Sequence, residues 1–471
     1  MCCKLAYTSY TESQQKSKKR KCAESDTPSV KKFLVNEHAC NQEAVTSSIA
    51  KYLLKSMRPV SEIENEGFVQ LLKALVPSYR PPCRKTMRST VTAICGKVEA
   101  RIRNDMSKVS YCAAQADIWS SRRMHGYFGL AVSYILDGKM STRLVACRRF
   151  TGSHTGENIA SLFVALVDEF NVRNIITAVV TDNAANMKKA FEQSMPRDTE
   201  DDFDDDGNGQ IERNMIEWTN VNEDIPFVIA ARYSCVAHSL QLVVYDGVKE
   251  ATDKIKNILA KCTKVVGSLH MSCKATELLE REAGRHIPIA NSTRWNSTHA
   301  MLDAIVKVEV DHPGLMSRAA SETGSTVRFT VMDYAVLTEV CKLLSPFADV
   351  TMRLEAEDTP TSSVVIPAVI GIISKLAKTT TPHCTSLKTG LTVSLEKRLG
   401  TIRTDPHYII STVLDPRFKM KWIDGQTEDA RVRLVMTESI ETQLRQQASH
   451  ASKFLTVWCL LTTATTSSYE I

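Results

Sequence analysis

Hydrophobic positions in the first half of the chain follow a spacing that predicts three strands in a row. Residues 113–119 and 126–135 are read as strands, and the second run is rich in aromatic and β-branched side chains, which favour extended backbone. Asp137 and Gly138 form a two-residue turn signal that typically closes a hairpin, and residues 142–150 supply the next strand-like run. The pattern therefore predicts an antiparallel meander.

Helical and strand-like spacing alternate in the residues that follow. Apolar side chains recur at every third or fourth position over 156–170, which predicts an amphipathic helix. Residues 175–180 form a continuous apolar run typical of a buried parallel strand, and 184–191 read as a helix. Another strand is expected at 227–230, after which the pattern becomes mostly helical to about residue 400. This order is compatible with an α/β ribonuclease H-like core followed by a helical region.

Composition limits the class of protein. The chain has 471 residues, of which 43% are hydrophobic and 24% charged, as in an ordinary globular protein. It contains no apolar run of about 18 residues, so no membrane span is expected, and its first residues lack the apolar segment of a secretory leader. Its 14 cysteines include no Cys-x-x-Cys pair, which indicates reduced thiols in the cytosol or nucleus.

The net charge of +6 is the sum of segments with opposite charge. The first 34 residues carry eight basic and three acidic side chains, and residues 197–226 carry eleven acidic and two basic ones. The rest of the chain then has a net charge of +10, which is compatible with a polyanionic partner. We expect the first segment to be disordered and the second to be an exposed acidic loop.

A basic cluster within the first segment resembles a nuclear-localisation signal. Its members are Lys16, Lys18, Lys19, Arg20 and Lys21. The alternative interpretation is a solvated basic tail without a targeting role. We expect the cluster to direct the protein to the nucleus.

Two acidic residues are candidates for metal binding. Asp117 lies near the end of the first predicted strand, and Asp182 directly follows the apolar run 175–180. If these strands are neighbours, both carboxylates lie at one edge of the sheet, where oxygen ligands suit Mg²⁺. The alternative is an ordinary strand-end aspartate that forms an Asx turn or caps a helix, which suits Asp182.

Seven segments together resemble the hAT superfamily of DNA transposases, most closely its domesticated relatives that contain a BED-type zinc finger (ZBED-like proteins). In chain order these segments are residues 66–79, 117–121, 152–159, 181–187, 235–242, 293–298 and 414–419. They include Asp117-Ile118-Trp119, Thr293-Arg294-Trp295-Asn296 and Leu414-Asp415-Pro416-Arg417-Phe418-Lys419. Their order and spacing match over residues 55–425, which is most of the chain.

The resemblance implies an α/β ribonuclease H-like core with a mixed sheet, interrupted by and followed by a large all-α insertion domain. The implied organisation is a disordered basic tail (1–45), an N-terminal helical region (46–110), the core with its acidic loop (111–247), the helical insertion domain (248–425) and a truncated C-terminal tail (426–471).

The resemblance also assigns roles to individual residues. Asp117 and Asp182 fall on the first and second catalytic carboxylates of the family. Arg294 and Trp295 fall on an Arg-Trp pair whose indole stacks on a flipped base, although simple helical packing is the alternative for this tryptophan. Cys235 and His238 match a Cys-x-x-His motif. No second pair stands at zinc spacing, so we expect these two to support the site structurally.

Three parts of the family pattern have no counterpart in this sequence. The residues before the core do not supply a BED finger, so no zinc is expected. Neither the third catalytic carboxylate, a glutamate, nor the C-terminal dimerisation region is recognisable after Lys419. With two carboxylates, Mg²⁺ or Mn²⁺ would be held loosely, and we expect neither DNA cleavage nor dimerisation through this region.

The sequence thus favours a nuclear, hAT-transposase-derived protein that is catalytically inactive. It would act through DNA or protein partners, plausibly in transcriptional regulation. The alternative is an active metal-dependent DNA transposase or nuclease. A further alternative is SUMO ligase activity, as in one branch of the BED-finger relatives, for which no residue here argues.

Overall fold

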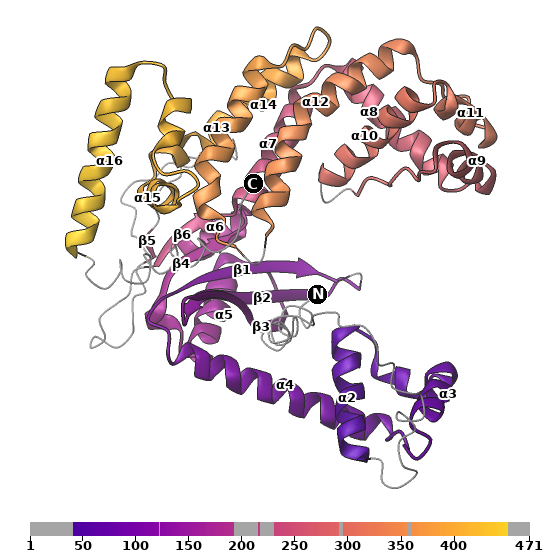
Figure 1. Cartoon of the computed structure of the whole chain (residues 1–471), viewed down its shortest axis with the longest axis vertical. Coiled ribbons are helices and arrows are strands. Elements are labelled where there is room, and N and C mark those ends of the chain that lie inside the picture. The colour runs from indigo at the N-terminus through magenta and orange to yellow at the C-terminus, as the bar shows by residue number, and fades with distance from the viewer. Residues whose placement is uncertain are drawn as a thin grey trace, which may run out of the picture. The chain divides into compact units, whose positions relative to one another are not determined.

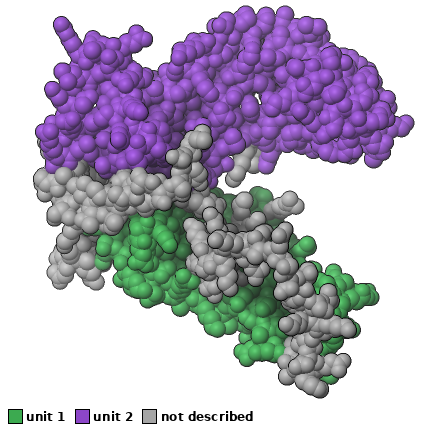
Figure 2. Space-filling model, in the orientation of Figure 1, with its two compact units in different colours: residues 1–181, 185–195, 215–232 green, residues 182–184, 196–214, 233–471 purple. Residues whose placement is uncertain are grey.

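The computed structural model describes residues 41–121, 123–192, 215–216, 230–291, 295–356 and 359–450. Backbone contacts divide the chain into two compact units (Figure 2). The sheet unit comprises residues 1–181, 185–195 and 215–232, and the helical unit comprises residues 182–184, 196–214 and 233–471. The division after residue 232 falls earlier than the limit of 247 that the sequence suggested.

A six-stranded mixed sheet organises the sheet unit (Figure 1). Its strand order is β3-β2-β1-β4-β6-β5, where the strands are β1 (Cys112–Ser120), β2 (Gly126–Leu136), β3 (Lys139–Phe150), β4 (Ile176–Thr181), β5 (Met215–Ile216) and β6 (Ala230–Ser234). The first three strands form the predicted antiparallel meander, and β4 lies parallel to β1. The mixed sheet is therefore confirmed.

The turn between β2 and β3 has the predicted form. Asp137 and Gly138 adopt φ values of +52° and +70°, the left-handed backbone that a two-residue hairpin turn requires. Strand β6 begins at the last residue of the predicted run 227–230, whose other residues lie outside the described ones. The polar residue Arg232 lies within β6 and donates from Nε to Oγ1 of Thr181 over 3.0 Å, so an apolar criterion ended the predicted strand before this residue.

One face of the sheet carries the core of the sheet unit. Alternate residues of β1 are buried, and the residues between them, such as Gln115, are exposed. The buried side packs against three helices, which are α4 (Arg84–Met106), α5 (Gly156–Glu169) and α6 (Ala185–Glu192). Phe163 of α5 meets Phe191 of α6 edge to face, with ring centroids 5.1 Å apart. The opposite face of the β1–β2 pair carries polar and aromatic side chains.

The N-terminal helices form a smaller apolar cluster of their own. Helices α2 (Gln42–Lys55) and α3 (Glu66–Leu75), the short helix η2 (Val60–Glu64) and the start of α4 contribute to it. Its buried members include Leu53, Tyr79 and Met87. These helices lie mainly within residues 46–110, for which the sequence predicted a helical region.

The helical unit consists of helices packed around one extended apolar core. These are α7 (Val236–Glu250), α8 (Asp253–Leu269), α9 (Cys273–Ala283), α10 (Trp295–Asp311), α11 (Leu315–Glu322), α12 (Val331–Leu354), α13 (Ser362–Lys378), α14 (Thr385–Leu399), α15 (Pro406–Leu414) and α16 (Ala430–His450). Gly247 lets α7 approach α14 closely, because a Cβ there would lie 2.6 Å from a methyl group of Leu391. No helix among the described residues is long and apolar enough to cross a membrane.

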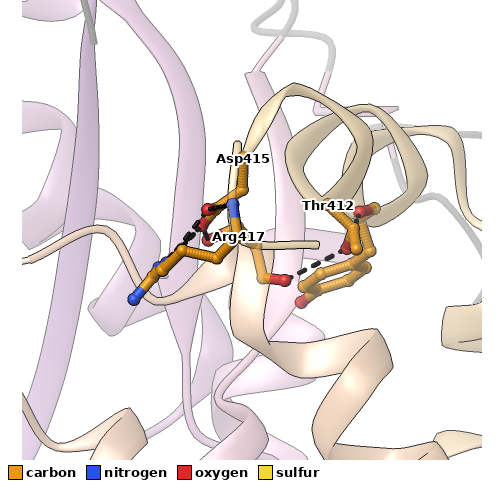
Figure 3. Close-up of polar contacts among 5 residues, drawn as sticks. Thr412, Asp415 and Arg417 are labelled. Atoms are coloured by element: carbon orange, nitrogen blue, oxygen red, sulfur yellow. Dashed lines mark hydrogen bonds and ion pairs between the residues drawn. The ribbon is translucent and has the colours of Figure 1, made fainter. Parts of the chain in front are cut away.

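A polar clamp in the motif 414–419 joins α13 to the turn after α15 (Figure 3). Asp415 accepts hydrogen bonds from Ser363 Oγ at 2.7 Å and from Arg417 Nη2 at 2.6 Å. Thr412 Oγ1 donates to the carbonyl oxygen of Ser363 over 3.2 Å. Burial alone would raise the pKa of Asp415, but the hydrogen bonds from Arg417 and Ser363 outweigh it and hold the pKa below its ordinary value. These hydrogen bonds therefore hold the turn after α15 against the start of α13.

The clamp predicts a pH-dependent stability. Because the folded-state pKa of Asp415 is lowered, its carboxylate stabilises the fold above its unfolded-state pKa of about 3.9. That contribution is lost as the pH falls through the folded-state pKa. We expect Asp415→Asn to lower the free energy of unfolding by about 2 kcal/mol at neutral pH, and by less below about pH 4. Urea denaturation across this pH range measures the difference.

Asp424 provides the matched control, because its side chain is 75% exposed and its ion pair with Arg433 is long, at 3.6 Å. Asp424→Asn is expected to change the free energy of unfolding by less than about 0.5 kcal/mol. Equal effects of the two substitutions, or a loss at Asp415 that does not change with pH, would contradict the clamp.

Candidate functional site

The two predicted carboxylates belong to neighbouring strands, Asp117 within β1 and Asp182 directly after the end of β4. Asp117 lies in β1, is exposed, and is paired with Gly129 of β2. The parallel register of β1 and β4 pairs Gln115 with Val180. Asp117 and Asp182 therefore each lie two residues beyond this pair along the chain. The parallel pairing of these strands, on which the metal hypothesis depended, is confirmed.

Asp182 also forms the Asx turn that was the alternative interpretation of this residue. Its Oδ1 accepts a hydrogen bond from the backbone N–H of Ala184 at 3.1 Å, which forms an Asx turn just before α6. The next residue, Asn183, donates from Nδ2 to Ser239 Oγ over 2.9 Å, and Ser239 Oγ donates to the carbonyl of Cys235 over 3.1 Å. Side-chain hydrogen bonds thus join the motif 181–187 to the Cys-x-x-His motif.

The Cys-x-x-His pair stands at the start of α7. Cys235 is the N-cap residue of this helix, His238 lies in its first turn, and both are half-buried. Within the part of the chain that the structure describes, no group of three or more His, Cys, Asp or Glu side chains is arranged to hold a metal ion. The supporting role of Cys235 and His238 stays a prediction.

The carboxylates of Asp117 and Asp182 suit a divalent cation by chemistry, because Mg²⁺ and Mn²⁺ prefer oxygen ligands. Asp182 shares its Oδ1 with the Asx turn, which orients this carboxyl group relative to the end of β4. That these two residues hold such an ion stays a prediction.

Trp295 is the first residue of α10 and packs inside the helical unit. Its half-buried ring lies edge to face with Phe347, at 6.5 Å and 89°, and with His299, at 6.1 Å and 64°. Its Nε1 is buried and has no hydrogen-bond partner among the described residues. These contacts agree with the alternative interpretation, in which Trp295 packs against neighbouring helices. The base-stacking role of Trp295 stays a prediction.

Several predicted residues lie outside the described ones. They are Arg294, most of the acidic loop 197–226, and the basic cluster Lys16, Lys18, Lys19, Arg20 and Lys21.

The motif 152–159 caps α5, a role that the sequence pattern did not assign. Thr155 Oγ1 accepts from the backbone N–H of Asn158 at 3.4 Å, and Asn158 Nδ2 donates to the carbonyl of Ser153 over 2.9 Å. His154 stacks on Phe150, with ring centroids 4.6 Å apart. A threonine three residues before an asparagine, ahead of an apolar helical pattern, was the available signal.

Comparison with known proteins gives two matches to family models. The model of the ZBED1 RNase-like domain matches residues 115–200, which begin within β1 and include β2, β3 and β4. The model of the ZBED1 RNase-like helical domain matches residues 233–343, which begin within β6 at the residue where the helical unit resumes. The α/β part of the chain is therefore RNase-like.

Curated relatives agree with these matches. Zinc finger BED domain-containing protein 4 from Homo sapiens is 22% identical over 405 residues, covering 80% of this chain and 30% of the relative. Putative AC transposase from Zea mays is 26% identical over 251 residues, covering 52% of this chain and 28% of the relative. Putative transcriptional regulator tpeD from Talaromyces stipitatus is 22% identical over 436 residues, covering 83% of this chain and 46% of the relative.

The chain thus spans less than half the length of each of these relatives. The two RNase-like matches, in the order sheet and then helices, agree with the motif resemblance over most of the chain. The chain is therefore similar to the hAT-type, ZBED-like group of transposase-derived proteins, which the family-model matches and the relatives together support.

Proposed function

We propose that this chain is a nuclear DNA-binding protein derived from a hAT transposase, that it does not cleave DNA, and that it takes part in transcriptional regulation. The observation that carries the proposal is the net charge of +10 on the chain outside its basic tail and acidic loop. Such a charge, on an RNase-like sheet and its helical companion, suits the phosphate backbone of DNA. The relatives named as a transposase and as a putative transcriptional regulator support it.

The architecture belongs to the same proposal. In our interpretation the helical unit is an insertion into a ribonuclease H-like core whose first part is the sheet unit. The order of the two family-model matches along the chain supports this interpretation. The N-terminal basic cluster supports nuclear import.

The absence of cleavage is proposed from the carboxylates. The family uses three of them, and this sequence supplies two at matching positions, Asp117 and Asp182. A divalent cation held there would neutralise negative charge on a phosphodiester. Asp182 already accepts the backbone N–H of Ala184, which is a structural reason for its presence without catalysis. Because both carboxylates are present, an active nuclease is the competing function.

DNA binding by the basic body predicts a steep dependence on salt. We expect the full chain to bind a labelled DNA duplex at about 50 mM salt. We further expect the affinity to fall at least about 100-fold by about 200 mM, because bound phosphates release condensed counterions. Fluorescence anisotropy measures this affinity, with polyglutamate as a competitor that carries charge without phosphates or bases. No binding at low salt, or an affinity that salt leaves unchanged, would overturn the proposal.

The absence of cleavage is tested with a nicking assay. Supercoiled plasmid is incubated with the full chain in Mg²⁺ or Mn²⁺, beside Asp117→Ala, Asp182→Ala and the surface control Asp311→Ala, whose side chain is 49% exposed. We expect all four proteins to give the same background in gel electrophoresis. Nicking by the natural chain and by Asp311→Ala, abolished in either of the other variants and by a chelator, would establish the active alternative.

A further inference from the structure

An aromatic pair lies on the open face of the sheet beside Asp117. In the antiparallel register, Trp119 of β1 is opposite Tyr127 of β2, and Tyr127 is opposite Arg149 of β3. Directly opposite residues project from the same face of a sheet, so these three side chains form one row. The neighbouring Phe128 is fully buried on the other face, whereas Trp119 and Tyr127 are half-buried. The pair is therefore outside the hydrophobic core.

The sheet is shaped to hold the indole in this position. The rings of Trp119 and Tyr127 are nearly parallel, at 17°, with centroids 6.0 Å apart. Gly129 lies under the indole, because a Cβ at this position would be only 2.7 Å from Cζ3 of Trp119. Gly129 is also the cross-strand partner of Asp117. The indole and the carboxylate are thus both neighbours of the same glycine.

The charges around the pair favour a nucleic-acid strand over an apolar peptide. Arg149, in the same row, is exposed, and Arg123, in the turn between β1 and β2, is exposed as well. Aromatic rings with adjacent cations on an open sheet face are suited to stack on unpaired bases and to contact the phosphates between them. A duplex keeps its bases stacked on one another, so the aromatic pair can stack only on the bases of an unpaired strand.

We propose that Trp119 and Tyr127 form a stacking platform for a base of single-stranded DNA, with Arg149 contacting the adjoining phosphate. The platform directs the bound strand past Asp117, the exposed carboxylate beside Gly129. This proposal rests on the proposed DNA-binding function and adds the kind of strand that is bound and the residues that bind it.

The test uses the full chain and a labelled oligothymidylate of about 12 nucleotides, within the usual site size for stacked single strands. We expect Trp119→Ala and Tyr127→Ala each to weaken binding about tenfold in fluorescence anisotropy. Trp119→Phe and Tyr127→Phe keep an aromatic ring and are expected to stay within about twofold of the natural chain. Tyr245→Ala is the matched control, because Tyr245 is 68% exposed on α7 of the helical unit.

A second measurement uses only the natural chain, so it does not depend on whether the variants fold. The same oligonucleotide carrying 5-bromodeoxyuridine is photocrosslinked to the natural chain, and mass spectrometry locates the modified peptide. Crosslinks at Trp119 or Tyr127 support the platform, and crosslinks confined to other residues overturn it. Circular dichroism and thermal unfolding of each variant show whether weaker binding comes from lost structure.

The outcomes separate this proposal from the proposed function. If the alanine variants bind the oligothymidylate as tightly as the natural chain, the platform is wrong, while salt-dependent binding to duplex DNA leaves the broader function standing. If the natural chain binds neither the oligonucleotide nor the duplex, both proposals fall together.

Discussion

The parallel pairing of β1 with β4 is the constraint on which the sheet unit depends. Parallel neighbours cannot be joined by a tight turn, so the chain needs a crossover, which α5 supplies between β3 and β4. The crossover helix and α6 bury one face of the sheet, and the covering helices draw alternate residues of β1 and β2 into the core. The remaining face carries side chains that lie outside this core, among them Asp117 and the Trp119–Tyr127 pair.

Polar groups hold the backbone at several of the motifs that identify the family. Thr155 and Asn158 fix the start of α5, and Asp415 fixes the turn after α15. These side chains make hydrogen bonds within their own unit. Their presence in a transposase-derived chain is therefore explained by folding alone, whether or not the chain cleaves DNA. Motif resemblance consequently identifies the family more firmly than it identifies an activity.

The same distinction applies to residues with an expected chemical role. Asp182 begins an Asx turn, and Trp295 packs edge to face with Phe347 inside the helical unit. Asp117, by contrast, is an exposed side chain on the open sheet face. An aspartate in the middle of a strand contributes little to the stability of that strand, because β-propensity favours branched and aromatic residues.

The sequence by itself determined the meander, its left-handed turn at Asp137 and Gly138, the helix from residue 156 and the succession of later helices, because these depend on local spacing and turn chemistry. It also identified Asp117 and Asp182 as candidates. Only the tertiary structure decided that β1 and β4 are neighbours, that β6 includes Arg232, and that Trp119 lies over Gly129. These features join residues far apart in the chain, and a register between strands is set by packing on the shared core, which local periodicity does not encode.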